Sequence, residues 1–300
     1  MKPLFLVLLC AYAATASAQT NCLQTAREVR PELSAETQRE FEAKLNEARE
    51  LFDKEPSAER VIWLGRRTAY LGRYKEAIEI FTNGIAEFPA DARLYRHRGH
   101  RYLTLRCFDR AVADFEQAAK LIKGKPDEIE PDGLPNARNI PTSTLQSNIW
   151  YHLGLAYYLK RDFRRALNAY REAEKVSNNP DMLVATTHWL YMTLRRLKRE
   201  NEAKQTLVKI RDDLELIENA DYYKLIRIYK GQLKAADLLA EISKNTDNLS
   251  NATLGYGLGN WLLYNGQRTE AEKIFRQITA GNQWASFGYI AAEAELAHVN

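Results

Sequence analysis

Hydrophobic and polar positions along this chain follow the period of amphipathic helices, and the helices come in pairs. The clearest stretch, residues 147–173, carries two apolar stripes at three- and four-residue steps, separated by a short polar turn at residues 159–162. Weaker copies of the same spacing stand before and after it. We therefore interpret residues 147–173 as one unit of a repeat array, which predicts an all-helical fold of stacked helix pairs.

Four segments, which start at positions 58, 92, 147 and 184, have similar residue types at the same places when each is numbered from its own first residue. Small residues at the eighth and twentieth places allow the two helices of a pair to approach closely, and a large residue at the twenty-fourth fills the remaining space. The residues at these places are Gly65, Ala77 and Phe81 in the first unit, Gly99, Ala111 and Phe115 in the second, Gly154, Ala166 and Tyr170 in the third, and Tyr191, Ala203 and Leu207 in the fourth.

This spacing is similar to that of the tetratricopeptide repeat (TPR) family, whose units begin with Trp-x2-Leu-Gly-x2-Tyr. Trp150, Leu153, Gly154 and Tyr157 reproduce that half of the pattern, and Pro89 ends the first unit where the family has proline. The resemblance implies an all-α, right-handed superhelical solenoid of TPR-like helix hairpins.

The predicted organisation adds a helix at each end of the array. Ser34 can cap an N-terminal helix that ends at Pro56 and covers the first unit. The predicted segments are a signal peptide at 1–18, a lead-in and N-terminal helix at 19–57, and a solenoid over 58–300 with units near 58–91, 92–123, 147–180, 184–215, 216–248 and 252–280 and a capping helix at 281–298.

A proline-rich stretch at residues 124–146 interrupts the array. It contains four prolines and two glycines, and it is longer than the connections of about two to eight residues that usually join packed helices. Asp127, Glu128, Glu130 and Asp132 form an acidic patch within it. Two interpretations remain open: a lid that lies against a basic face, or a solvated connection.

The first helices of a TPR stack line its concave face, where the family binds extended peptides. When the family's ligand-binding positions are transferred to the same places in each unit of this chain, they give a basic and aromatic face. Such a face suits an acidic or polar segment, because guanidinium groups pair with carboxylates. We therefore predict a scaffold that binds a protein or peptide in its concave groove. The candidate ligand-binding residues are Arg66, Tyr70, Arg93, Arg96, His100, Asn148, Tyr151, His152, Tyr158 and His188, with Asp132, Asn136 and Arg138 from the 124–146 loop.

Two other functions remain as alternatives. A structural component of a cell-envelope complex would use the convex side or an end of the stack. An enzyme that depends on a metal or a small molecule finds little support, because the sequence lacks a nucleophile elbow, a phosphate loop and a paired metal motif. His97, His100, His152 and His188 fall on first helices, but no carboxylate or cysteine joins them at ligand spacing. We expect neither a metal nor a cofactor.

Charge and the N-terminus indicate where the protein works. The formal net charge of +4 over 300 residues is too small to favour nucleic acid. Lys2, the apolar run at 4–14 and the small residues Ala16 and Ala18 predict a signal peptide cut before Gln19. The run is too short for a stable membrane anchor. We expect an exported protein, periplasmic or secreted, with a bacterial source as the first expectation.

Cys22 and Cys107 remain after that cut. In an oxidising compartment they could close one disulfide, and the alternative is a pair of free thiols.

Overall fold

The computed structural model of the chain describes residues 22–243 and 249–298. Within these ranges the regular structure is helical, apart from an isolated antiparallel bridge between Ile129 and Thr144. None of the described helices is both long and apolar enough to cross a membrane. The predicted signal peptide falls outside the described residues. The all-helical solenoid predicted from the sequence is confirmed.

Successive helices pair as hairpins behind an N-terminal helix, α2 (Ala35–Lys54). The first helices of the units are α3 (Ala58–Tyr70), α5 (Ala92–Thr104), α7 (Leu145–Leu159), α9 (Pro180–Arg196), α11 (Ala220–Tyr229) and α13 (Leu249–Tyr264). The second helices are α4 (Tyr74–Glu87), α6 (Phe108–Leu121), α8 (Phe163–Val176), α10 (Glu200–Leu207), α12 (Ala235–Ile242) and α14 (Arg268–Ala280). The capping helix is α15 (Phe287–Leu296), and it follows α14 as one more first helix.

Most first helices begin at a polar side chain that accepts a hydrogen bond from a backbone N–H of the first turn. The fourth unit shows the pattern: the side chain of Asn179 accepts from the N–H of Met182, and Pro180 occupies the first helical turn. This helix therefore starts earlier than the predicted position 184. The side chains that cap in this way are Ser34, Ser57, Asp91, Thr144, Asn179 and Ser286.

Four of the described hairpins are closed by a glycine that faces an aromatic ring. A Cβ atom added to Gly154 would lie 2.7 Å from a ring carbon of Tyr170, which is closer than two carbon atoms can approach. The same contact recurs in the other units with glycine at the eighth place. The pairs are Gly65 with Phe81, Gly99 with Phe115, Gly154 with Tyr170 and Gly259 with Phe275.

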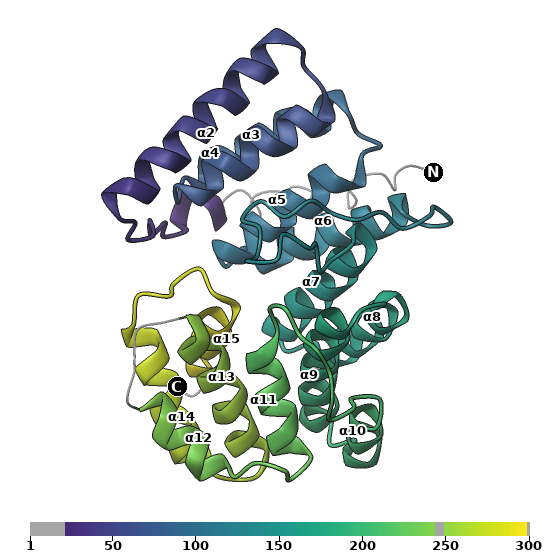
Figure 1. Cartoon of the computed structure of the whole chain (residues 1–300), viewed down its shortest axis with the longest axis vertical. Helices are drawn as coiled ribbons and strands as arrows, with labels where there is room; N and C mark the ends of the chain where they lie inside the picture. Colours follow the sequence, from purple (N-terminus) through teal and green to yellow (C-terminus); the bar gives the residue numbers. More distant parts are fainter. Residues whose placement is uncertain (1–21, 244–248, 299–300) are drawn as a thin grey trace, which may run out of the picture.

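The last helices turn back toward the middle of the array. In Figure 1 the chain runs from α2 to α10 and then turns back, so that α11 and α13 contact α9 and α15 contacts α7. Glu293 and Glu295 of α15 pair with two basic residues of earlier turns, Arg106 Nε at 2.6 Å and Arg161 Nη1 at 3.1 Å. The solenoid thus closes on itself at α15.

This return covers the concave side of the third and fourth units. The ring of Tyr256 on α13 stacks on Trp189 of α9 with ring centres 5.7 Å apart, and its hydroxyl donates to the hydroxyl of Tyr158 on α7 at 3.1 Å. Because α7 and α9 pack against second helices on one side and C-terminal helices on the other, they are buried on nearly every face. The concave groove expected along all units is therefore filled over α7 and α9.

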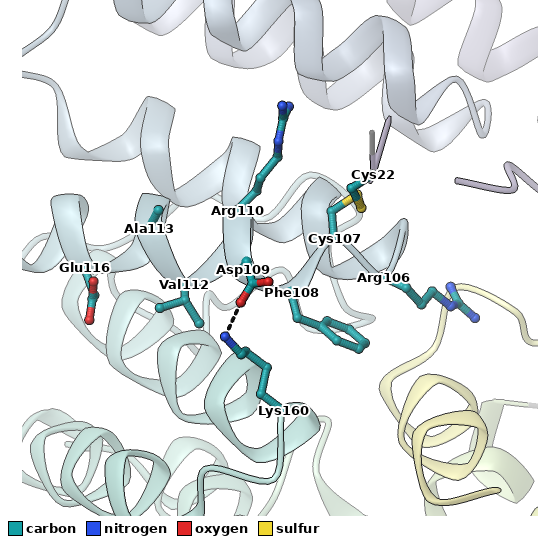
Figure 2. A pocket seen from close by; sticks show the side chains of 10 residues that line it. All are labelled: Cys22, Arg106, Cys107, Phe108, Asp109, Arg110, Val112, Ala113, Glu116 and Lys160. Atoms are coloured by element: carbon teal, nitrogen blue, oxygen red, sulfur yellow. Dashed lines mark hydrogen bonds and ion pairs between the residues drawn. A yellow bond between two sulfur atoms is a disulfide. The ribbon is translucent and has the colours of Figure 1, made fainter. Parts of the chain in front are cut away.

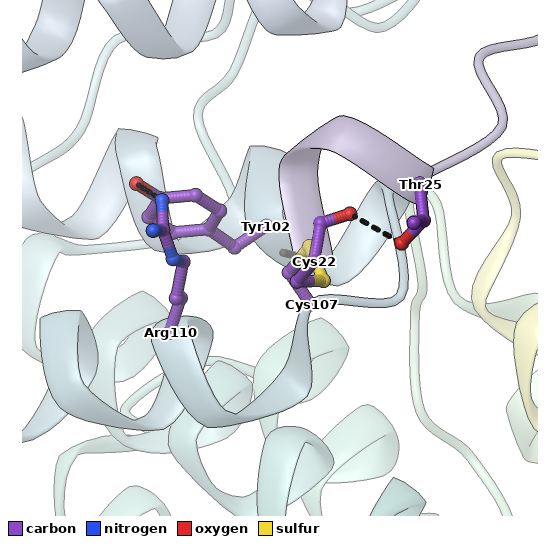
Figure 3. Close-up of a disulfide and its surroundings, with 5 residues drawn as sticks. All are labelled: Cys22, Thr25, Tyr102, Cys107 and Arg110. Carbon is purple, nitrogen blue, oxygen red and sulfur yellow. Dashed lines mark hydrogen bonds between the residues drawn. A yellow bond between two sulfur atoms is a disulfide. The ribbon is translucent and has the colours of Figure 1, made fainter. Parts of the chain in front are cut away.

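The N-terminal segment is held to the second unit by a disulfide between Cys22 and Cys107 (Figure 3). Cys107 stands at the turn before α6, and the bond spans a sequence separation of 85 residues. The carboxylate of Glu28 accepts a hydrogen bond from the N–H of Lys75 at 2.7 Å. From Cys22 onward, the lead-in therefore packs along the turns of the first two units.

The contact of Gly154 with Tyr170 predicts the cost of a single methyl group. We expect Gly154→Ala to lower the free energy of unfolding by about 1–3 kcal/mol, because the tightly packed helices must separate to admit it. Urea denaturation followed by circular dichroism measures the change. In a Tyr170→Leu background the ring is gone, so the alanine should cost less; an equal cost in both backgrounds would contradict the explanation.

Candidate functional site

Basic and aromatic side chains gather on the first helices of the first two units. On α3, Arg66 and Tyr70 lie one turn apart, and Arg66 Nε donates to the Tyr70 hydroxyl at 3.3 Å. On α5, Arg96 and His100 are also one turn apart, with Arg101 beside them. We call these five residues the α3–α5 face.

The long loop, residues 124–146, lies against this face and places one carboxylate into it. Glu130 is only 8% exposed, and its Oε1 lies 3.0 Å from Arg96 Nη2. Its Oε2 accepts a hydrogen bond from Asn148 Nδ2 at 3.1 Å, and His97 Nε2 is 3.5 Å from Oε1. Burial lowers the pKa of Arg96, and Glu130 opposes that shift. The loop therefore supplies the counter-ion of a buried arginine.

Further along, the long loop crosses the end of α3. The carbonyl oxygen of Gly133 accepts a hydrogen bond from Arg67 Nη1 at 3.0 Å, and a Cβ atom on Gly133 would overlap the Tyr70 hydroxyl. Only glycine fits this contact. Burial raises the pKa of neighbouring Asp132, and the carboxylate of Glu218 adds to the rise.

The far end of the long loop is tied to the segment before α11. Arg138 Nη1 lies 2.6 Å from Glu215 Oε1, and the Thr142 hydroxyl donates to Glu218. Asn136 folds the loop locally, since its Oδ1 accepts from the N–H of Arg138 at 3.1 Å. Of the candidate loop residues, Asp132 thus lies beside the basic face, whereas Asn136 and Arg138 shape and anchor the loop.

Two arginines of the α3–α5 face have no carboxylate partner among the described residues. Arg66 lies over the ring of Trp63 at 4.5 Å, and Arg101 Nη2 is 2.6 Å from Nδ1 of His100. Burial lowers the pKa of Arg101 to about 10, with Arg96 and Arg66 contributing further repulsion. The face therefore holds more positive charge than its single buried carboxylate balances.

Apart from Asn148, whose amide holds Glu130 against it, the other predicted ligand residues do not join this face. Arg93 is occupied by ion pairs with Asp91 and Glu59, both at 2.7 Å. The remaining side chains lie in the interior under the C-terminal helices. These buried positions are Tyr151, His152, Tyr158 and His188, and Asn148 is buried beneath the long loop.

A cavity of about 370 Å³ opens beside the face. His100 forms one wall, and Phe287 of α15 and Tyr222 of α11 form others. The ring centres of His100 and Phe287 are 5.4 Å apart. Glu218 and Asp221 line the cavity as well, so it combines aromatic walls with an acidic rim.

A second cavity, of about 530 Å³, lies over the start of α6 (Figure 2). Phe108 and Val112 give it an apolar floor, and an ion pair between Lys160 and Asp109 borders it. The Cys22–Cys107 disulfide forms its edge. In Figure 3 the neighbouring Arg110 reaches the hydroxyl of Tyr102 on α5. This cavity offers no excess of unpaired charge.

Sequence reasoning missed Arg101, Phe287 and Tyr222. Arg101 is the neighbour of the predicted His100. The high arginine content of α5 could have indicated from the sequence that Arg101 belongs to the basic face. Phe287 and Tyr222 reach the face only because the C-terminal helices turn back, and nothing local in the sequence indicates that return. Among the described residues, no three histidine, cysteine, aspartate or glutamate side chains are grouped to hold a metal ion.

Comparisons with known proteins point to one repeat family. The family model described as tetratricopeptide repeat matches residues 147–180. None of the curated proteins matches the sequence.

Among solved structures, this chain is similar to several helical-repeat proteins. YrrB, described as a TPR protein with an unusual peptide-binding site, is 14% identical with a TM-score of 0.44, and the match covers 83% of this chain and 97% of that one. The MamA RS-1 double mutant is 15% identical with a TM-score of 0.45, covering 68% and 94%. A putative kinesin light chain of Podosopora anserina is 16% identical with a TM-score of 0.42, covering 80% and 96%. Likeness at this level does not indicate a shared partner.

The buried histidines predict a loss of stability in mild acid. Burial lowers the pKa of His152 and His188 from 6.5 to about 3. Both stay neutral in the folded protein, while the unfolded chain takes up protons below its own pKa, so stability is full above about pH 6.5 and falls as the pH drops. Between about pH 7 and about pH 5.5 we expect a loss of about 1 kcal/mol for each of the two.

Urea denaturation at the two pH values measures this loss. His188→Gln should reduce the difference between them, and His298→Gln, at an exposed position, serves as the matched control. A pH dependence that is the same in both variants would contradict the assignment.

Proposed function

Because residues 147–180 match the tetratricopeptide repeat model and the helix pairs around them repeat its spacing, we propose that this chain is a binding scaffold that takes an acidic segment of a protein partner on its α3–α5 face. The concave sides of α7 and α9 are filled by the chain itself, which leaves the first two units for this role. We further propose that it acts after export, in a periplasm or outside the cell, where a structural disulfide persists.

One observation carries the proposal: the face already holds an acidic segment of the same chain. Glu130 is bound by an arginine and an amide, Arg96 and Asn148, in the way that a partner's carboxylate would be. The residues around it include further acids, Glu128 and Asp132. A surface that clamps one carboxylate by charge-assisted hydrogen bonds has the chemistry to clamp another.

The arginines without a carboxylate partner would attract a further acidic residue of a partner. Arg66 and Arg101 lie on the face without carboxylate partners among the described residues, so an incoming acidic segment would neutralise charge that the fold leaves uncompensated. The cavity between His100 and Phe287 would receive an apolar or aromatic side chain of the same segment. The preferred partner is therefore an acidic segment with an aromatic or aliphatic residue within it.

The long loop would compete with such a partner. Its inner side carries Glu130 and Gly133 against the face, whereas Ile129, Leu134 and Ile140 are exposed by 68%, 54% and 50%. Apolar side chains left in solvent do little to hold a loop in place. A partner that replaces Glu130 at Arg96 would displace the loop.

Binding to a synthetic peptide tests the proposal. The probe is a labelled peptide with the sequence of residues 127–134, Asp-Glu-Ile-Glu-Pro-Asp-Gly-Leu, and its control has every acid replaced by the amide. We expect fluorescence anisotropy to show roughly tenfold tighter binding of the acidic peptide, about 1.4 kcal/mol. Replacing both Arg66 and Arg101 with alanine should remove that preference, because the attraction is electrostatic.

Arg276→Ala, at an exposed position on α14, controls for a general loss of positive charge. Equal affinity for the two peptides, or an Arg276→Ala effect as large as that at the face, would refute the proposal.

Competition by the loop predicts a second result. Glu130→Gln should lower the thermal midpoint, because Arg96 loses its counter-ion, and it should raise the affinity for the acidic peptide several-fold, because the site is vacated. Adding the peptide should restore part of the lost midpoint in the variant. Glu128→Gln, outside the clamp, provides the comparison. A Glu130→Gln protein that binds no better than the natural chain would exclude competition.

A further inference from the structure

The turns inside the hairpins differ in one residue. In the first, fifth and sixth units this residue is a glycine with positive φ, at Gly72, Gly231 and Gly266. In the second, third and fourth units the same left-handed conformation is adopted by long basic residues: Arg106 at φ 61°, Arg161 at φ 60° and Lys198 at φ 60°. A side chain with a Cβ atom is disfavoured in this conformation, and glycine adopts it freely.

The two arginines have partners on the capping helix, and the lysine has none. Arg106 pairs with Glu293 and lies over the ring of Trp284 at 3.9 Å, and Arg161 pairs with Glu295. The backbone N–H of Lys198 donates to the carbonyl oxygen of Arg195 at 3.0 Å, but its ammonium group makes no hydrogen bond or ion pair with the described part of the chain. Two turn residues of this kind thus bind carboxylates, and the third is left with a free ammonium group.

Lys198 lines a cavity of about 400 Å³ where the turns of the third, fourth and sixth units meet the end of α15. We call it the turn pocket. Its charged lining residues are Arg161, Arg195, Arg196, Lys198, Arg268, Glu272 and Glu295.

The carboxylates of the turn pocket are already engaged. Glu295, 8% exposed, is shared by Arg161 at 3.1 Å and Arg196, whose Nη2 lies 3.2 Å from it. Glu272 accepts from Arg268 at 2.8 Å. These two carboxylates face five permanent cations, so the pocket carries an excess of positive charge.

The remaining cations of the pocket are poorly paired. Arg195 Nη2 donates to the amide oxygen of Asn265 at 3.0 Å, and its nearest carboxylate, Glu200, is 3.7 Å away. The guanidinium group is held in place over the ring of Tyr264 at 4.4 Å. The C-terminal carbonyl groups of α9 and α13 offset part of the positive charge of the pocket. They do not bind the ammonium group of Lys198, which projects from its turn.

We propose that the turn pocket binds a phosphate group, free or as a small phosphate monoester. A phosphate dianion brings two negative charges to a pocket with an excess of three positive ones, and its oxygens can accept from Lys198, Arg161 and Arg195. The cavity is larger than the anion itself, which leaves room for a small organic group beside Tyr264 and Leu263. This site is separate from the α3–α5 face and does not depend on the function proposed for it.

Lys198→Gly tests the proposal, because it separates the lysine's charge from its role in the fold. Glycine relaxes the turn, so the variant should be at least as stable as the natural protein, and any loss of binding cannot be ascribed to unfolding. With the full chain in low-salt buffer, isothermal titration with inorganic phosphate and with glucose 6-phosphate should show saturable binding. Lys198→Gly should weaken it at least tenfold.

Lys120→Ala on α6, which removes one exposed lysine elsewhere, should leave phosphate affinity unchanged. Tighter binding of glucose 6-phosphate than of inorganic phosphate identifies a monoester ligand, and equal binding identifies the free anion; both support a phosphate site. The absence of saturable binding, or an equal effect of Lys120→Ala and Lys198→Gly, would overturn the proposal, whatever the peptide experiments show.

Discussion

The close approach of a glycine to an aromatic ring governs the geometry of this molecule. Gly154 and Tyr170 leave no room between them for a methyl group, and three other hairpins repeat the contact. In these four hairpins the contact sets how closely the two helices approach. The first helices, which carry the functional side chains, are therefore held by local packing against their own second helices.

Closure of the array follows from the same packing and decides which surface stays open. Once α11 and α13 lie against α9, their apolar sides cover positions that an open solenoid would expose to a ligand. Acidic residues of α15 then meet basic residues in the turns of the second and third units, which ties the last helix to these units. The C-terminal helices cover one part of the chain's own concave groove, and the long loop covers another part. Segments of the same chain thus occupy positions where an open repeat array would bind a partner.

The sequence was sufficient to predict the repeats but not their closure. Places eight, twenty and twenty-four are local signals, and they located the hairpins around Gly65, Gly99 and Gly154 correctly because the contacts that use them lie within one unit. The burial of His152 and His188 could not be read in this way, since their neighbours Phe287 and Tyr222 come from distant units. The acidic patch of the long loop was visible in the sequence, whereas the choice of Glu130 as its buried member depends on how the loop folds against Arg96.

The disulfide between Cys22 and Cys107 has a consequence for how the molecule withstands damage. It closes a covalent ring that contains α2, both helices of the first unit and α5. A protease that cuts once anywhere inside this ring would break the chain without releasing a fragment, because the severed N-terminal piece stays bonded to the turn before α6. The part of the protein that carries the α3–α5 face is thus the part whose pieces remain together after a single cleavage.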